Sequence, residues 1–195
     1  MGSLITDTPH SEVTATLEVL DRLGVGRDDL KRFRKAGTKL KAEVAKLLKH
    51  GFTNGAVIDC DAAPFIPEGW SVESHQQGGQ FAFDPSMVEF YSAKGQRGNG
   101  YVEGNKLRTE LADKPVLNAN VLDYLLANPD LIPEEWKTNG AGETRYIFFW
   151  GTIYRGSYGG LCVRYLYWRD GSWDWGDGWL AGGWRGSYPA AVRAS

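Results

Sequence analysis

The sequence predicts an α+β protein, with a small N-terminal three-helix module followed by a mixed domain that ends in a C-terminal antiparallel β-meander. Residues 10–50 carry apolar side chains at helical spacings, whereas residues 145–184 alternate as aromatic-rich strands do. No long crossover helix separates these later strands, which favours an antiparallel sheet over a doubly wound α/β fold. We therefore expect a helical module over 1–52 and an α+β domain with a Trp-rich antiparallel meander over 53–195.

Three short helices are expected in the N-terminal module. Gly24 and Gly26 separate the first helix from the second, and Asp28 and Asp29 suit the first turn of the second helix, because acidic side chains favour a helix N-terminus. Gly37 then ends the second helix and precedes the third.

The middle of the chain alternates between short strands and helices. Runs bounded by Pro, Gly, Asn and Asp predict two or three strands between residues 51 and 104, at 70–74, 81–83 and 87–91. Helical spacing returns at residues 105–111 and 116–128, and a single helical turn is expected at Pro133–Trp136.

The C-terminal meander is expected to begin with two core strands, near residues 145–154 and 161–168. The first strand places Tyr146, Phe148 and Trp150 on one face and apolar residues on the other, so it is predicted to be central and buried. Short Trp-rich strands separated by Asp-Gly and Gly-Gly turns follow.

Composition indicates a turn-rich protein outside the membrane. The chain has 195 residues, 25 of them glycine, and a net charge of -2. No apolar stretch approaches the roughly 20 residues of a membrane-spanning helix. We expect a cytoplasmic protein without a membrane partner. Cys60 and Cys162 are interpreted as small buried apolar residues rather than as a disulfide.

Tryptophan carries the leading functional hypothesis, since six of the eight tryptophans lie between residues 150 and 184. The last four stand among glycine and aspartate, and exposed indoles of this kind suit stacking on sugars, bases or cationic groups. They are Trp173, Trp175, Trp179 and Trp184. The hypothesis is a non-enzymatic binding or adaptor protein whose partner is a protein or a small ligand; an all-structural role is the alternative.

A basic segment supports a second hypothesis, nucleic-acid binding. Residues 27–50 hold nine basic residues against three acidic ones, and Lys31, Arg34, Lys35 and Lys39 are the candidates for phosphate contact. The alternative is an ordinary solvated helix face.

An enzyme is the third hypothesis, a hydrolase or transferase centred on Asp59 and Asp61, with His75 as a weak candidate for acid–base chemistry. The alternatives are an Asp pair that caps a turn and a hydrogen-bonded histidine. The sequence has no recognisable set of metal ligands, and no cofactor is expected.

Several longer motifs resemble a group of uncharacterised bacterial proteins. They are IDCDAAPFIPEGW, EGNKLR, LNANVLDYLL, PEEWK, FFWGTIYR and VRYLYW, and the similarity spans roughly residues 57–192. The resemblance implies a shared fold and a prokaryotic, intracellular setting. It implies no activity and no functional residue.

Overall fold

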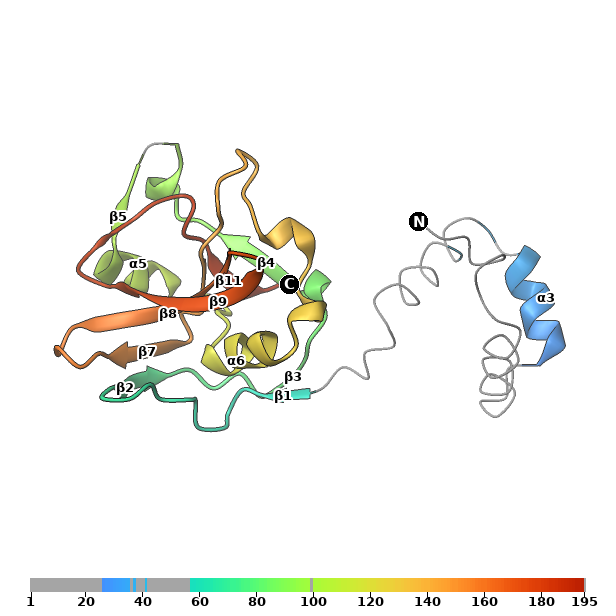
Figure 1. Ribbon diagram of the computed structural model, residues 1–195, viewed down its shortest axis with the longest axis horizontal. Helices are drawn as coiled ribbons and strands as arrows, with labels where there is room; N and C mark the ends of the chain where they lie inside the picture. The colour runs from blue at the N-terminus through green and yellow to red at the C-terminus, as the bar shows by residue number, and fades with distance from the viewer. Residues whose placement is uncertain (1–25, 36, 38–40, 42–56, 99, 195) are drawn as a thin grey trace. The chain divides into compact units, whose positions relative to one another are not determined.

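The computed structural model describes residues 26–35, 37, 41, 57–98 and 100–194 (Figure 1). The chain divides into two units, Met1–Thr53 and Asn54–Ser195. In the first unit, helix α3 spans Arg27–Lys35. Asp29 accepts a hydrogen bond from the backbone N–H of Gly26 at the start of this helix. As expected, an acidic side chain in the first turn stabilises the positive end of the helix dipole.

The second unit is built mainly from strands. Its first five are β1 (Val57–Asp59), β2 (Ser71–His75), β3 (Gln80–Ala82), β4 (Val88–Tyr91) and β5 (Val102–Glu103). The remaining six are β6 (Ile147–Phe148), β7 (Thr152–Arg155), β8 (Leu161–Arg169), β9 (Ser172–Trp179), β10 (Gly183–Trp184) and β11 (Ala190–Arg193). Helices α5 (Gly104–Leu111) and α6 (Ala119–Ala127) complete it, with 3₁₀ turns at Pro85–Met87, Lys94–Gln96, Pro129–Leu131 and Glu134–Trp136.

Strand β8 pairs with three other strands of the main seven-stranded sheet, which curls into a half-barrel. Strand β9 pairs along nearly all of β8, so β6 and β7 must share the opposite edge of β8. Beyond them, β2 pairs with β7, β11 lies parallel to β6, and β4 pairs with β11. Two short antiparallel pairs, β1–β3 and β5–β10, lie outside this sheet.

Both faces of the main sheet are covered. Ile147, Phe149 and Leu166 belong to a core shared with α6, whereas Phe148 and Val163 belong to a second core that includes residues of α5. Neighbouring residues of a strand point to opposite faces, so one segment supplies both cores. Figure 1 shows α5 and α6 on different sides of the β8–β9 ribbon. The predicted burial on both faces of this segment is confirmed.

Glycine in β9 makes room for aromatic rings rather than turning the chain. A Cβ at Gly176 would approach the Tyr165 hydroxyl oxygen to 2.5 Å, and one at Gly178 would approach the Phe148 ring to 2.8 Å and the Trp184 ring to 3.0 Å. Bulky rings therefore lie directly across this part of the strand. Within the segment expected to form several short strands, Ser172–Trp179 is one continuous eight-residue strand, and β10 follows it.

We expect Gly178→Ala to lower the free energy of unfolding by about 1–3 kcal/mol, because the added methyl group overpacks the core around Phe148 and Trp184. Urea unfolding of the purified protein measures this change. Gly140→Ala is the control, since a Cβ at Gly140 meets nothing within 4 Å. Equal effects of the two substitutions would contradict the packing role of Gly178.

The predicted fold class is wrong. The described residues contain three α-helices in all, only α3 lies before β1, and sheet predominates, so the α+β class with a three-helix N-terminal module does not hold. The predicted first helix, and the third apart from Lys41, lie outside the described residues. The physical reason for the excess of sheet is long-range pairing: residues 57–103 supply five strands, where two or three were expected, because short segments gain partners far along the chain.

Helices α5 and α6 do follow the predicted helical spacings, and Asn118 caps the start of α6 by accepting the backbone N–H of Asn120. In the described part of the chain, no helix combines the length and the apolar character needed to cross a membrane.

Candidate functional site

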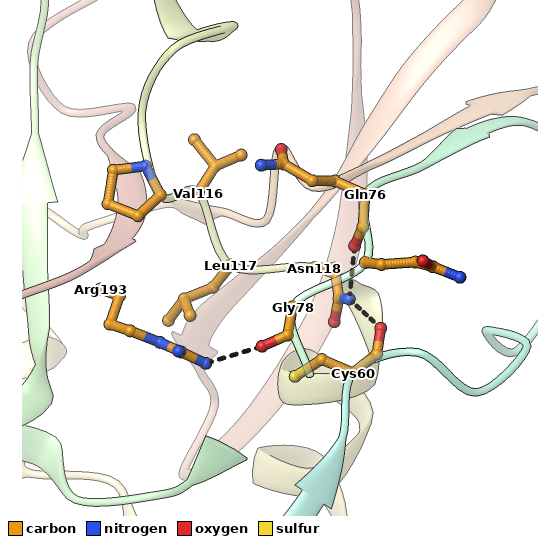
Figure 2. A pocket seen from close by; sticks show the side chains of 9 residues that line it. Cys60, Gln76, Gly78, Val116, Leu117, Asn118 and Arg193 are labelled. Atoms are coloured by element: carbon orange, nitrogen blue, oxygen red, sulfur yellow. Dashed lines mark hydrogen bonds between the residues drawn. The ribbon is translucent and has the colours of Figure 1, made fainter. Parts of the chain in front are cut away.

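A polar pocket of about 270 Å³ lies where β1, β2 and β11 approach the start of α6 (Figure 2). Cys60, Gln76, Asn118 and Arg193 are among the residues that line it. The Asn118 amide nitrogen donates to the carbonyl oxygens of Cys60 at 2.7 Å and Gln76 at 3.1 Å, as the dashed lines in Figure 2 show. Asn118 thus joins three segments, and its hydrogen-bonding capacity is used within the fold.

The thiol in this pocket is not an activated nucleophile. Burial raises the pKa of Cys60 above its ordinary 9.0, nearby Arg193 lowers the pKa by less, and Asp61 and Asp59 raise it further. The thiol therefore stays protonated at neutral pH, and the thiolate is the reactive form. The Arg193 guanidinium donates to the Gly78 carbonyl oxygen at 3.1 Å and stacks over the Phe81 ring.

Asp59 and Asp61, the candidate catalytic pair, are exposed and hydrogen bonded to backbone. Asp59 accepts the N–H of Asp61 at 3.0 Å, and Asp61 accepts the N–H of Gly79 at 2.8 Å. This is the geometry of side chains that stabilise turns. The pair adjoins the polar pocket through Cys60, although neither carboxylate is among its lining residues.

His75 connects β2 to β7 and to the turn that follows β1, rather than approaching a reactive group. Its Nε2 lies 3.1 Å from the Cys60 carbonyl oxygen, and its Nδ1 lies 2.8 Å from the Thr152 hydroxyl oxygen. A carbonyl oxygen can only accept, so Nε2 carries a proton; in the neutral ring, Nδ1 then accepts from the hydroxyl group. Among the described residues, no group of three His, Cys, Asp or Glu side chains is arranged to hold a metal ion.

A second pocket, of about 150 Å³, has aromatic walls. We call it the aromatic pocket; it is lined by Trp70, Tyr158, Cys162, Asp177, Trp179 and glycine-rich residues of the β7–β8 turn. The turn is closed by the Gly156 N–H, which donates to the Gly160 carbonyl oxygen at 2.9 Å. The Trp179 indole lies against Gly160, where a Cβ would come within 3.4 Å of the ring. The indole is therefore held against backbone on one side.

The pairing of β8 and β9 explains why these groups share a face. Directly paired residues of antiparallel strands point the same way, and Cys162 pairs with Trp179 while Arg164 pairs with Asp177. The same face continues to Trp175, whose ring lies 4.2 Å from the Arg164 guanidinium carbon and 6.3 Å from the Trp70 ring.

The four tryptophans proposed for binding have different surroundings. Trp184 is 2% exposed and packs against Phe148 and Trp150, so it belongs to the core. Trp173 and Trp175 are partly buried and pack against the core that contains α6. Trp179 is 55% exposed. The structure therefore concentrates the accessible indole surface of this set on Trp179.

Asp177 places a carboxylate within the aromatic pocket. Burial raises the pKa of Asp177, and a hydrogen-bond interaction with the Trp179 indole lowers it by less. Arg164 is its partner in the strand register, but this guanidinium forms an ion pair with Asp123 at 2.8 Å instead. Within the described residues, Asp177 forms no ion pair. The negative charge of Asp177 is thus partly desolvated, and no described cation pairs with it.

No family model matches this chain, and no curated protein or solved structure is significantly similar to it. The function is therefore inferred from the geometry of the two pockets.

The candidate basic residues lie in the first unit. In α3, Lys31 pairs with Asp28 at 2.8 Å and Arg32 pairs with Asp29 at 3.7 Å. Part of the positive charge of the helix is consequently balanced within it. Arg34 and Lys35 are exposed near its C-terminus, and Lys39 lies outside the described residues.

Sequence reasoning missed Trp70, Tyr158 and Asp177 as parts of a site. The segment WDWGDGW did contain a signal, because an unbroken strand places Trp175, Asp177 and Trp179 on one face. That alternation was not recognised because the glycines were interpreted as turn residues. Trp70 and Tyr158 reach the pocket through strand pairing, which the local pattern does not reveal.

Proposed function

We propose that this protein is a non-enzymatic binding or adaptor protein whose contact site is the aromatic pocket, with Trp179 as its principal contact. One observation carries the proposal: Trp179 is 55% exposed in a pocket, beside a partly buried carboxylate, although the same sheet buries other large rings. A large exposed indole offers contact area at a small cost in conformational entropy, and tryptophan is enriched at binding hot spots.

Further exposed apolar side chains support this location. Tyr158 belongs to the aromatic pocket, and Phe65 lies 5.3 Å from the Arg164 guanidinium carbon, on the same sheet face as Asp177. Phe65, Ile66 and Tyr158 are all exposed. Exposed aromatic residues on the same sheet face as a polar pocket group are typical of interaction surfaces.

A comparison of captured partners tests the proposal. The wild-type protein, Trp179→Ala and Tyr101→Ala are immobilised, and the proteins and small molecules that each retains from a cell extract are quantified by mass spectrometry. Tyr101 is the matched control, because it is an exposed aromatic residue outside the aromatic pocket. We expect Trp179→Ala alone to lose specific partners.

Equal retention by all three proteins would overturn the proposal. Circular dichroism and urea unfolding establish beforehand that the variants are folded, so that a loss of partners reports on the surface.

A further inference from the structure

We propose that the aromatic pocket binds a primary alkylammonium group, the chemistry of a lysine side chain on a partner protein, with Asp177 as the counter-ion and the Trp179 indole as the apolar contact. This inference rests on the proposed function and names the chemical class of its ligand.

Charge complementarity is the first argument. The Asp177 carboxylate is partly removed from water, and no described cation forms an ion pair with it. The nearest strand partner, Arg164, is bound to Asp123. Beside the pocket, Arg155 pairs with Glu73 at 2.7 Å and donates to the Gly159 carbonyl oxygen at 2.8 Å, so it braces the turn. A cationic ligand would therefore supply the positive charge that the described residues do not place beside the Asp177 carboxylate.

The walls of the pocket favour the same ligand. Indole faces attract cations through their electron-rich surface, and Trp70 and Trp179 both line the pocket. The apolar stem of a lysine side chain packs on aromatic surface while its ammonium group reaches a polar partner. The volume of about 150 Å³ is also small. Pockets for drug-sized molecules begin at about 300 Å³, so a single side chain fits this one better.

Hydrogen-bond geometry distinguishes ammonium from guanidinium. A guanidinium group binds a carboxylate most strongly through two parallel hydrogen bonds that use both oxygens. In the aromatic pocket, the Asp177 carboxylate shares a volume of about 150 Å³ with two indoles, which restricts the space for a planar fork. An ammonium group behaves as a compact point charge and needs no paired acceptor, so it suits a carboxylate in so small a pocket.

The surroundings favour a lysine that belongs to a protein. Tyr158 and Trp179, which line the pocket, are 89% and 55% exposed, respectively. A free amine would leave these apolar surfaces in water, whereas a partner protein could cover them while it inserts one side chain.

NMR titration of the full chain tests the proposal directly. The probes are N-acetyl-lysine methylamide, its Nε-acetylated form and N-acetyl-arginine methylamide, and the readout is the indole N–H signal of Trp179. We expect the lysine probe to shift this signal saturably. Neutralising its ammonium by acetylation is expected to weaken binding by about tenfold or more, since hydrogen bonds to charged groups are the stronger ones.

Variants of the protein test the contribution of the Asp177 carboxylate. Asp177→Asn is expected to weaken binding of the lysine probe by about tenfold. Asp174→Asn is the matched control, because Asp174 is an aspartate of the same strand that points to the opposite face. It is expected to bind as the wild type does. If Asp177→Asn does not fold, the acetylated probe measures the contribution of charge on the wild-type protein.

Three results would overturn the alkylammonium assignment: equal binding of the acetylated probe, tighter binding of the arginine probe, or no effect of Asp177→Asn. If the lysine probe does not bind but Trp179→Ala still loses partners, the inference fails and the proposed function stands. A free amine as the true ligand would appear as butylammonium binding at least as tightly as the lysine probe, and that result overturns the assignment to a partner protein.

Discussion

Replacing Trp184 by alanine is expected to lower the free energy of unfolding by about 3–5 kcal/mol, which is typical of removing a buried aromatic side chain. Trp184 is 2% exposed, and its ring lies 4.3 Å from that of Phe148 and 4.7 Å from that of Trp150. Its removal would leave a cavity in the core that also contains α5 residues. Chemical denaturation followed by circular dichroism measures the loss.

Trp179→Ala is the matched comparison for Trp184→Ala. It removes the same side chain from the same tryptophan-rich segment, but from an exposed position, so it is expected to change stability by less than about 1 kcal/mol. Similar losses for the two variants would contradict the division between a core indole and a contact indole, and with it the choice of Trp179 for binding.

Replacing Asp123 by alanine is expected to destabilise the protein by about 3 kcal/mol, because it strands a buried guanidinium without its counter-ion. Arg164 is 1% exposed, and its Nη2 lies 2.8 Å from the Asp123 carboxylate. The Nε and Nη1 atoms of Arg164 have no hydrogen-bond acceptor among the described residues. Asp123 is therefore its main electrostatic partner, and urea unfolding measures the effect of losing it.

Two further variants show whether the loss of stability comes from the isolated charge or from the ion pair. Glu134→Ala removes a surface ion pair with Lys137 of the same 2.8 Å length and is expected to cost at most about 1 kcal/mol. The double variant Arg164→Met/Asp123→Leu replaces both buried charges by apolar groups and is expected to recover most of the stability lost by Asp123→Ala. A double variant as unstable as Asp123→Ala would show that the ion pair itself, rather than the isolated charge, determines the cost.

The sequence predicted local structure better than long-range structure. Residues 147–150 are buried on both faces as expected, but the strand predicted over 145–154 divides into β6 and β7. The division occurs where Gly151 passes so close to Asn118 that a Cβ there would lie 2.7 Å from the asparagine Cβ. This contact joins segments more than thirty residues apart, and no local periodicity encodes it.

The candidate site was predicted in part for the same reason. The terminal tryptophans of the leading hypothesis include one exposed indole, that of Trp179. Whether an indole is covered depends on distant residues: Trp184 is packed by Phe148 and by the start of α5 at Gly104. A composition of glycine and tryptophan is compatible with either outcome. The pairing of β9 with β8 and of β10 with β5 separates them.

The outer edge of β9 has a consequence for the behaviour of the protein in solution. In the described part of the chain β9 pairs only with β8, and an open strand edge can recruit a strand from another molecule. Here the carboxylate of Asp174 accepts the backbone N–H of Trp175 at 2.7 Å. An incoming strand would have to displace this bond and approach a negative charge, so we expect Asp174 to disfavour strand pairing at this edge.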